Sequence, residues 1–117
     1  MCQKQFGAPF SLLVAVRGEV EWTRGRPGHF QSSDNVKRGF CALCGTPLSF
    51  ETEDVVELAV GTFDDRLDLA PQLQVNHTDR IPWAETMFEA PVREAAKDAA
   101  NQAGIRSRQH PDHETTS

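Results

Sequence analysis

Tyrosine is absent from this sequence of 117 residues, and seven phenylalanines supply most of its aromatic side chains. Aromatic packing is therefore largely free of polar groups, and no phenolic hydroxyl is available for acid–base chemistry. Long apolar runs are also missing, since none approaches the roughly 18 residues of a membrane-spanning helix. The amino terminus lacks the basic-then-apolar order of a signal peptide. The sequence predicts a cytoplasmic protein that has no membrane partner.

Positive charge is scarce. Lys and Arg number 12 against 17 Asp and Glu, which gives a net charge of -5. The isoelectric point is near 5.3. Domains that bind nucleic acids usually present a basic face, so no nucleic-acid partner is expected. A chain of this length fits one domain with a modest core, which buries somewhat under ~70% of the surface that the unfolded chain exposes.

Cysteine is limited to Cys2, Cys41 and Cys44. An odd number of thiols cannot all form disulfides, and in a reducing compartment closely spaced thiols more often bind metal or carry out redox chemistry. Two sulfurs bound to one zinc ion lie ~3.7 Å apart, which a tight Cys-x-x-Cys turn can present. Gly45 can take the left-handed conformation that ends such a turn. Cys41 and Cys44 therefore predict half of a zinc site, which needs two further ligands.

Alternatives remain for each thiol and for the missing ligands. A redox pair would require a thioredoxin-like βαβ setting, whereas strands are expected around Cys41 and Cys44, so structural zinc is the favoured interpretation. Cys2 lies close to Lys4, which favours the ionised thiol, and is interpreted either as a metal-binding or reactive thiol or as an unused one. His29 and His77 could supply ligands, but packed or surface imidazoles are commoner.

Most of the remaining chain predicts β-structure. Short apolar or alternating runs are bounded by glycine, proline and small polar residues. The first two runs are expected to pair with each other, and two later runs are expected to lie behind the cysteine turn. Asp64 and Asp65 are expected to form a turn rather than a paired-carboxylate site. The expected strands are 11–16, 20–23, 29–32, 36–40, 48–51, 55–60 and 73–77.

One helix is expected, near the carboxyl terminus. Good helix formers follow Pro91 and end at Gly104, with proline at the start and glycine at the stop. Its apolar face is mostly alanine, so little buried area is expected from it. Trp83 is expected to cover an edge of the core. The predicted organisation is a zinc-binding domain at 1–90, the helix at 91–104 and a disordered tail at 105–117, where His110 and His113 are solvated.

Four stretches together resemble the glutathione-dependent formaldehyde-activating enzyme family, also called the centromere protein V domain. The resemblance covers about residues 2 to 83. It implies a mainly β fold, the β-tent of folded-over antiparallel sheets around a zinc knuckle. The stretches are Cys2-Gln3-Lys4 with Gly7-Ala8-Pro9-Phe10, Gly39-Phe40-Cys41-Ala42-Leu43-Cys44-Gly45-Thr46-Pro47-Leu48, Gly61-Thr62-Phe63-Asp64-Asp65, and Pro82-Trp83.

The resemblance also implies two zinc sites. In the family, an early Cys-x-Cys joins the later Cys-x-x-Cys to hold a structural zinc, and a middle Cys-x-Cys-x-x-Cys holds a second zinc with an open position. By position, Cys41 and Cys44 resemble half of the structural site, and Cys2 resembles the last cysteine of the middle motif. The other cysteines of both motifs are missing. Met1 falls on the variable residue before that last cysteine, as expected of a member truncated at its amino terminus.

The function that the resemblance implies is zinc-dependent carbon–sulfur lyase chemistry. Such enzymes add glutathione to formaldehyde and form S-hydroxymethylglutathione, and an open zinc position could ionise the thiol or polarise the carbonyl. Cys2, as a ligand of that zinc, is the expected catalytic residue. Lys4, Arg17 and Arg38 are candidates to bind the glutathione carboxylates. The alternative is a non-catalytic zinc-binding interaction module or an inactive fragment of the family, because metal ligands are missing.

Overall fold

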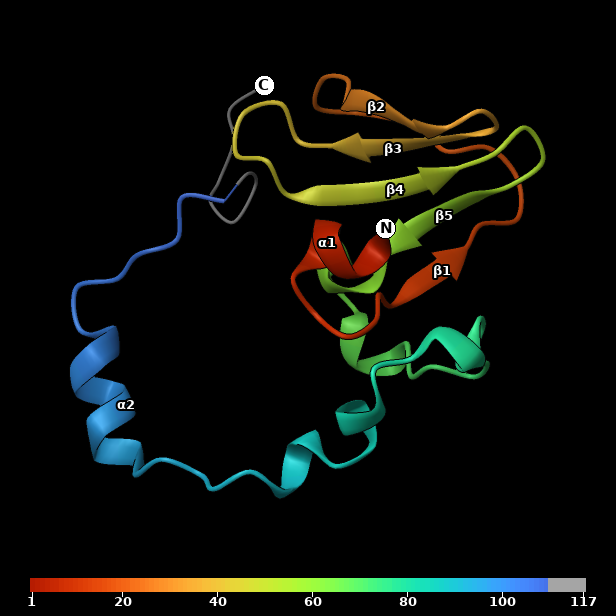
Figure 1. The fold of residues 1–117 in the computed structure, drawn as a ribbon. Helices are drawn as coiled ribbons and strands as arrows, with labels where there is room; N and C mark the ends of the chain where they lie inside the picture. Colours follow the sequence, from red (N-terminus) through yellow and green to blue (C-terminus); the bar gives the residue numbers. More distant parts are fainter. Residues whose placement is uncertain (110–117) are drawn as a thin grey trace.

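The computed structural model describes residues 1–109 and contains a five-stranded antiparallel sheet (Figure 1). The order across the sheet is β1-β5-β4-β3-β2. The predicted mainly β class is confirmed at this level, but the strands of residues 1–109 form one sheet and not a folded-over pair. The strands are β1 (Leu13–Ala15), β2 (Gly28–Ser33), β3 (Val36–Phe40), β4 (Pro47–Glu51) and β5 (Val56–Ala59).

The sheet is built mainly from consecutive strands. β2 pairs with β3, β3 with β4 and β4 with β5, and all the runs predicted for this stretch became strands. Successive residues of a strand point to opposite faces. Val36, Arg38 and Phe40 of β3 therefore share one face, while Lys37 and Gly39 share the other. Val36 and Arg38 are buried on the first face, and Gly39 is buried on the second, where it lies opposite the buried Ser49.

The prediction of a strand at 20–23 is wrong, and so is the expected pairing of the first two runs. The first run forms β1, which pairs antiparallel with β5 and places Val14 opposite Leu58. Residues 20–23 pair with no strand, although β1 and β2 each have one open edge. The strand predicted at 73–77 is also absent, because Asn76 adopts a left-handed conformation (φ 56°) and a 3-10 helix follows it.

The described residues contain two α-helices, of which one was predicted. The α1 helix (Cys2–Phe6) ends at Gly7, which has φ 64° and donates its N–H to the carbonyl of Gln3 at 3.0 Å. Helix-forming residues followed by a left-handed glycine were a usable signal for it. The expected C-terminal helix is confirmed as α2 (Ala95–Gln102). Short 3-10 helices lie between the sheet and α2: η1 (Val60–Thr62), η2 (Arg66–Asp68), η3 (His77–Asp79), η4 (Pro82–Glu85) and η5 (Met87–Glu89).

The core is small. Among the described residues the buried apolar side chains are those of Val36 and Ala59. The side chains of Arg38 and Ser49 are also buried, although they are polar. Trp83 is 56% exposed, so the prediction that it covers the core edge is wrong. The α2 helix stands away from the sheet (Figure 1) and has no buried residue.

The remaining predictions concern the turn, the tail and the membrane. Asp64 and Asp65 lie in a turn, as predicted. Of the predicted tail, residues 105–109 are exposed coil, while residues 110–117, with His110 and His113, lie outside the described residues. No helix within residues 1–109 is long and apolar enough to cross a membrane.

Candidate thiol and metal site

The Cys-x-x-Cys turn, residues 41–46, joins β3 to β4. The N–H of Cys41 donates to the carbonyl of Thr46 and the N–H of Gly45 donates to the carbonyl of Cys41, both at 2.8 Å. Gly45 has φ 79°, the left-handed conformation expected from the sequence. The Cys44 sulfur lies 3.1 Å from the Thr46 hydroxyl. The backbone therefore closes the tight turn on which the prediction of a metal-binding pair depends.

Cys2 lies at the start of α1, where its sulfur meets Arg38 of β3. The guanidinium of Arg38 donates from Nη1 to the Cys2 sulfur at 3.3 Å and to Gln5 Oε1 at 2.6 Å. Its Nε donates to Ser32 Oγ at 3.2 Å, and its centre lies 5.0 Å from the centroid of the Phe50 ring. Arg38 is only 5% exposed, and a buried guanidinium requires such partners. Arg38 therefore ties α1 to the sheet and orients the thiol.

The environment of Cys2 changes its acidity. Partial burial acts to raise the pKa of the thiol, whereas hydrogen bonds from Ser11 and Arg38 and the positive charges of Arg38 and the amino terminus act to lower it. Together the stabilising contacts outweigh desolvation, so the pKa of Cys2 lies below its ordinary value. The thiolate is the nucleophilic and metal-binding form of cysteine, and this environment favours it.

A cavity of about 410 Å³ lies against α1 and β3; Arg38, which contacts the Cys2 sulfur, lines it, and Cys2 itself is not among its lining residues. Of the basic residues proposed from the sequence to bind carboxylates, Lys4 and Arg38 line the cavity, and Arg17 is not among its lining residues. The cavity brings the Cys2 helix and the Cys-x-x-Cys turn to one place. Its walls come from Met1 and α1 (Lys4, Gln5), from β2 and β3 (Phe30, Ser32, Arg38, Phe40) and from the turn and the start of β4 (Gly45, Pro47).

The donor set does not complete a zinc site. Cys41 and Cys44 are suitable ligands for two of the four positions of zinc. Within residues 1–109, however, no group of three or more His, Cys, Asp and Glu side chains is arranged to hold a metal ion, so the structure does not join Cys2 to this pair. None of the three thiols forms a disulfide.

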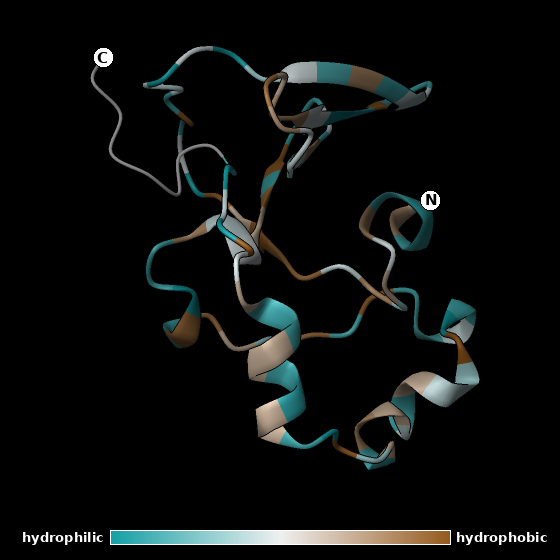
Figure 2. Cartoon of the chain, turned by 90° about the vertical axis from the view of Figure 1, so that its left-hand side faces the viewer, coloured by the Kyte–Doolittle hydropathy of each residue, from teal (hydrophilic) through white to brown (hydrophobic). Residues whose placement is uncertain are grey.

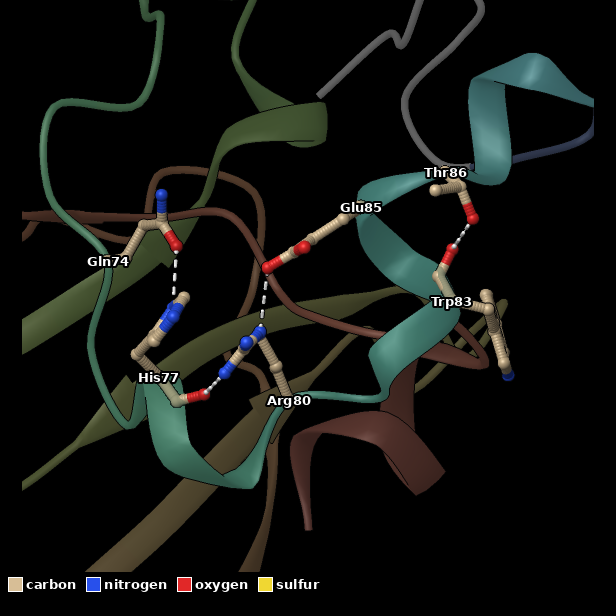
Figure 3. A network of polar contacts seen from close by, with 6 residues as sticks. All are labelled: Gln74, His77, Arg80, Trp83, Glu85 and Thr86. Carbon is tan, nitrogen blue, oxygen red and sulfur yellow. Dashed lines mark hydrogen bonds and ion pairs between the residues drawn. The ribbon is translucent and has the colours of Figure 1, made fainter.

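The histidines considered as missing ligands have other partners. His29 Nε2 lies 2.7 Å from Glu51 Oε2, and His77 Nδ1 lies 3.0 Å from Gln74 Oε1 (Figure 3). Both are surface imidazoles with hydrogen bonds to nearby side chains, which agrees with the commoner interpretation of such residues.

A second polar cluster lies across β2, β3 and β4, and the sequence did not reveal it. Ser49 Oγ donates to Glu51 Oε2 at 2.8 Å, and the same carboxylate oxygen contacts His29. Gly39 lies between them, with His29 opposite on one side and Ser49 opposite on the other. The absence of a side chain at Gly39 leaves the space in which the cluster meets. The strand register places these residues together, and register was not predicted.

The contact between Cys2 and Arg38 was likewise missed, although Arg38 was a candidate for binding carboxylates. A usable signal existed, because alternation in β3 places Arg38 on the same side as Val36 and Phe40. A charged residue at an apolar position of a strand needs a partner inside the fold. Nothing local identified Cys2, 36 residues away in sequence, as that partner.

Comparison with known proteins places the chain in a family. Neither the curated proteins nor the solved structures contain a significant match. The family model described as "Glutathione-dependent formaldehyde-activating enzyme" matches residues 1–79, a span that includes all three cysteines and the whole sheet. The match confirms the resemblance found in the sequence, and the chain therefore belongs to the glutathione-dependent formaldehyde-activating enzyme family.

Proposed function

We propose that this protein is a zinc-dependent carbon–sulfur lyase-like protein that acts on glutathione and an aldehyde such as formaldehyde. Membership of the family supports this reaction class. The observation that carries the proposal to this chain is the cavity next to the helix of Cys2, whose lining includes the basic residues Lys4 and Arg38. We further propose that the chain belongs to a β-tent domain at 1–90 followed by the helix at 91–104 and a tail at 105–117.

The reaction forms one carbon–sulfur bond. The sulfur of glutathione adds to the carbonyl carbon of formaldehyde, the carbon–oxygen π bond opens, and the proton of the thiol ends on the oxygen of S-hydroxymethylglutathione. The reverse reaction breaks the same bond. Glutathione carries two carboxylates, and the exposed ammonium of Lys4 at the cavity suits one of them. Phe30 and Phe40 supply apolar lining to the same cavity, against which a small aldehyde would bind.

Zinc is part of this proposal as a cofactor. Cys41 and Cys44 would hold two positions of a structural zinc, and Cys2 would be a ligand of the open zinc site. Because the described residues complete neither site, we derive no step of the reaction from zinc. The incomplete donor set also supports a second candidate function, a zinc-binding interaction module of this family without catalysis.

Activity on the purified chain distinguishes the two functions. Proton NMR exchange between formaldehyde and S-hydroxymethylglutathione is expected to be faster with the zinc-supplemented chain than without it. Lys4→Gln is expected to raise the KM for glutathione by about threefold, the effect of losing one exposed ion pair. Arg17→Gln removes the same charge away from the cavity and is the matched control. Exchange at the uncatalysed rate would overturn the lyase proposal and favour the interaction module.

A further inference from the structure

The Cys-x-x-Cys turn presents two zinc ligands and needs two more. The thiols of Cys41 and Cys44 can occupy two of the four tetrahedral positions. Within residues 1–109 no further side chain joins them in a metal-binding group. Structural zinc sites that contain two cysteines are commonly completed by two histidines. Imidazoles that can reach this turn are therefore the candidates for the missing ligands.

The four histidines of the chain fall into two pairs. His29 and His77 have hydrogen-bond partners on the surface, and neither belongs to a metal-binding group within residues 1–109. His110 and His113 lie outside the described residues. In the sequence His110 is the next residue after Gln109, and His113 follows three positions later. The contacts of Gln109 therefore bear on what these two histidines can reach.

The end of the described chain lies at the cysteine turn. Thr46 donates from Oγ1 to Gln109 Oε1 at 2.6 Å, and the same hydroxyl lies 3.1 Å from the Cys44 sulfur. These two contacts in series place the Gln109 amide oxygen within about 6 Å of that sulfur. The N–H of Gln109 donates to Ser107 Oγ at 3.2 Å, which folds the chain just before it. His110 follows one peptide unit further, about 3.8 Å along the chain.

Packing of the α2 helix does not bring the chain back to the turn. This helix has no buried residue, and hydrophilic and weakly hydrophobic bands alternate along it without a strongly apolar face (Figure 2). It stands away from the sheet, and the segment after it runs back toward the turn between β3 and β4 (Figure 1). The contact of Gln109 with Thr46 therefore joins this segment to the sheet.

We propose that His110 and His113 complete a zinc site with Cys41 and Cys44. The sequence His110-Pro111-Asp112-His113 favours this, because proline and aspartate at its central positions predict a β-turn, whose first and last Cα atoms lie within about 7 Å of each other. Both imidazoles can then bind one ion. Two thiolates and two neutral imidazoles also balance the charge of Zn²⁺.

The inference rests on the structural zinc of the proposed function and is independent of the lyase reaction. For the metal-bound chain it replaces the expectation that His110 and His113 are solvated. It also assigns the segment after α2 a role, which is to carry two ligands back to the cysteine turn.

X-ray absorption at the zinc edge, on the full chain loaded with one equivalent of zinc, identifies the ligands. Two sulfurs at about 2.3 Å and two imidazole nitrogens at about 2.0–2.1 Å are expected. Three sulfurs would show that Cys2 joins the pair, and two sulfurs without imidazole would show that water or a carboxylate completes the site. Either result would overturn the proposal.

Variants locate the ligands. His110→Asn combined with His113→Asn is expected to weaken zinc binding by ~100-fold or more, since two of the four ligands are lost. Competition with a coloured chelator measures the affinity. His77→Asn is the matched control and is expected to bind zinc as the parent does. All strands of the sheet end by Ala59, so the double variant leaves the sequence of the sheet unchanged. A double variant that binds zinc as tightly as the parent would contradict the proposal.

Trypsin gives an independent readout. Arg106 and Arg108 are exposed, and zinc is expected to slow cleavage after them in the parent but not in the double variant, because metal binding orders the segment. Cleavage that zinc leaves unchanged in the parent would count against the proposal. A parent chain that binds no zinc would overturn the structural zinc of the proposed function as well. Zinc held by Cys41 and Cys44 without the histidines would overturn this inference alone.

Discussion

At the scale of single residues, Arg38 has the largest influence on the candidate site. It is a buried cation whose hydrogen bonds reach Cys2, Gln5 and Ser32. Removing one partner of a buried charge lowers the stability of the fold by more than the contact itself contributes, because the buried charge is left without compensation. Arg38 therefore determines both where α1 lies and how easily the Cys2 thiol ionises.

The pKa of Cys2 gives a prediction for the chain freed of metal by a chelator. Arg38→Gln removes a hydrogen-bond donor and a positive charge, so the pKa of the Cys2 thiol is expected to rise and alkylation by iodoacetamide near neutral pH to slow. Well above the pKa the two proteins should react at the same rate. Mass spectrometry of the peptide that contains Cys2 measures this, with Cys41 and Cys44 as internal references. An unchanged pH profile would contradict it.

The same shift has a consequence for stability against pH. Because the pKa of Cys2 is lower in the folded chain than in the unfolded one, the ionised thiol stabilises the folded state. That contribution is fully present above the pKa of the unfolded thiol. It is lost as the pH falls through the lower pKa of the folded chain.

At the scale of elements, β3 depends on a residue without a side chain. A Cβ at Gly39 would collide with Ser49 Oγ and lie 3.4 Å from Glu51 Oε2. The hydrogen bonds of the second polar cluster leave these atoms little freedom to move. Gly39 is therefore required by close approach within the sheet and not by its backbone angles.

Gly39→Ala is expected to lower the free energy of unfolding by about 1–3 kcal/mol, the usual effect of overpacking. Gly61→Ala is the matched control, because a Cβ there meets nothing within 4 Å, and it should leave stability unchanged or raise it by about 0.4–1 kcal/mol. Urea titration followed by circular dichroism measures both. Equal midpoints for the two variants would show that Ser49 and Glu51 move aside.

Elements were predictable where the signal was local. β3, β4 and β5 follow from alternation and β-branched residues between clear turns, and α2 follows from its composition and from Gly104. The run at 20–23 has a strand-like pattern but pairs with no strand, and β1 pairs instead with β5, more than 40 residues further along the chain. A short stretch of sequence does not indicate which distant strand it pairs with.

In the candidate site, too, the local features were predictable from the sequence and the long-range contacts were not. The turn at Cys41 and Cys44 was predictable, because its spacing and Gly45 specify the local backbone. The contact of Cys2 with Arg38 and the cluster at His29 depend on which strands and helices become neighbours. Register and helix docking decide these contacts, and single-residue patterns carry little information about either.

At the scale of the whole molecule, the number of metal ligands limits what the chain can bind. At most about one zinc per chain is expected, held through Cys41 and Cys44, since a complete site needs four ligands. Cys41→Ser and Cys44→Ser are expected to lose this zinc and the protection from proteolysis that it gives, because zinc binding contributes to folding stability in such sites. Native mass spectrometry with limited proteolysis measures both effects. Two tightly held ions, or variants as resistant as the parent, would contradict this account.

The shared wall of the cavity has a thermodynamic consequence. Gly45 and Pro47 line the cavity, and Gly45 directly follows Cys44. A metal that orders this turn acts on the same atoms that a ligand in the cavity would touch. Coupling between two binding sites is reciprocal. Any factor by which metal changes the affinity for glutathione must equal the factor by which glutathione changes the affinity for metal, so the thiol substrate would regulate how firmly the protein holds its metal.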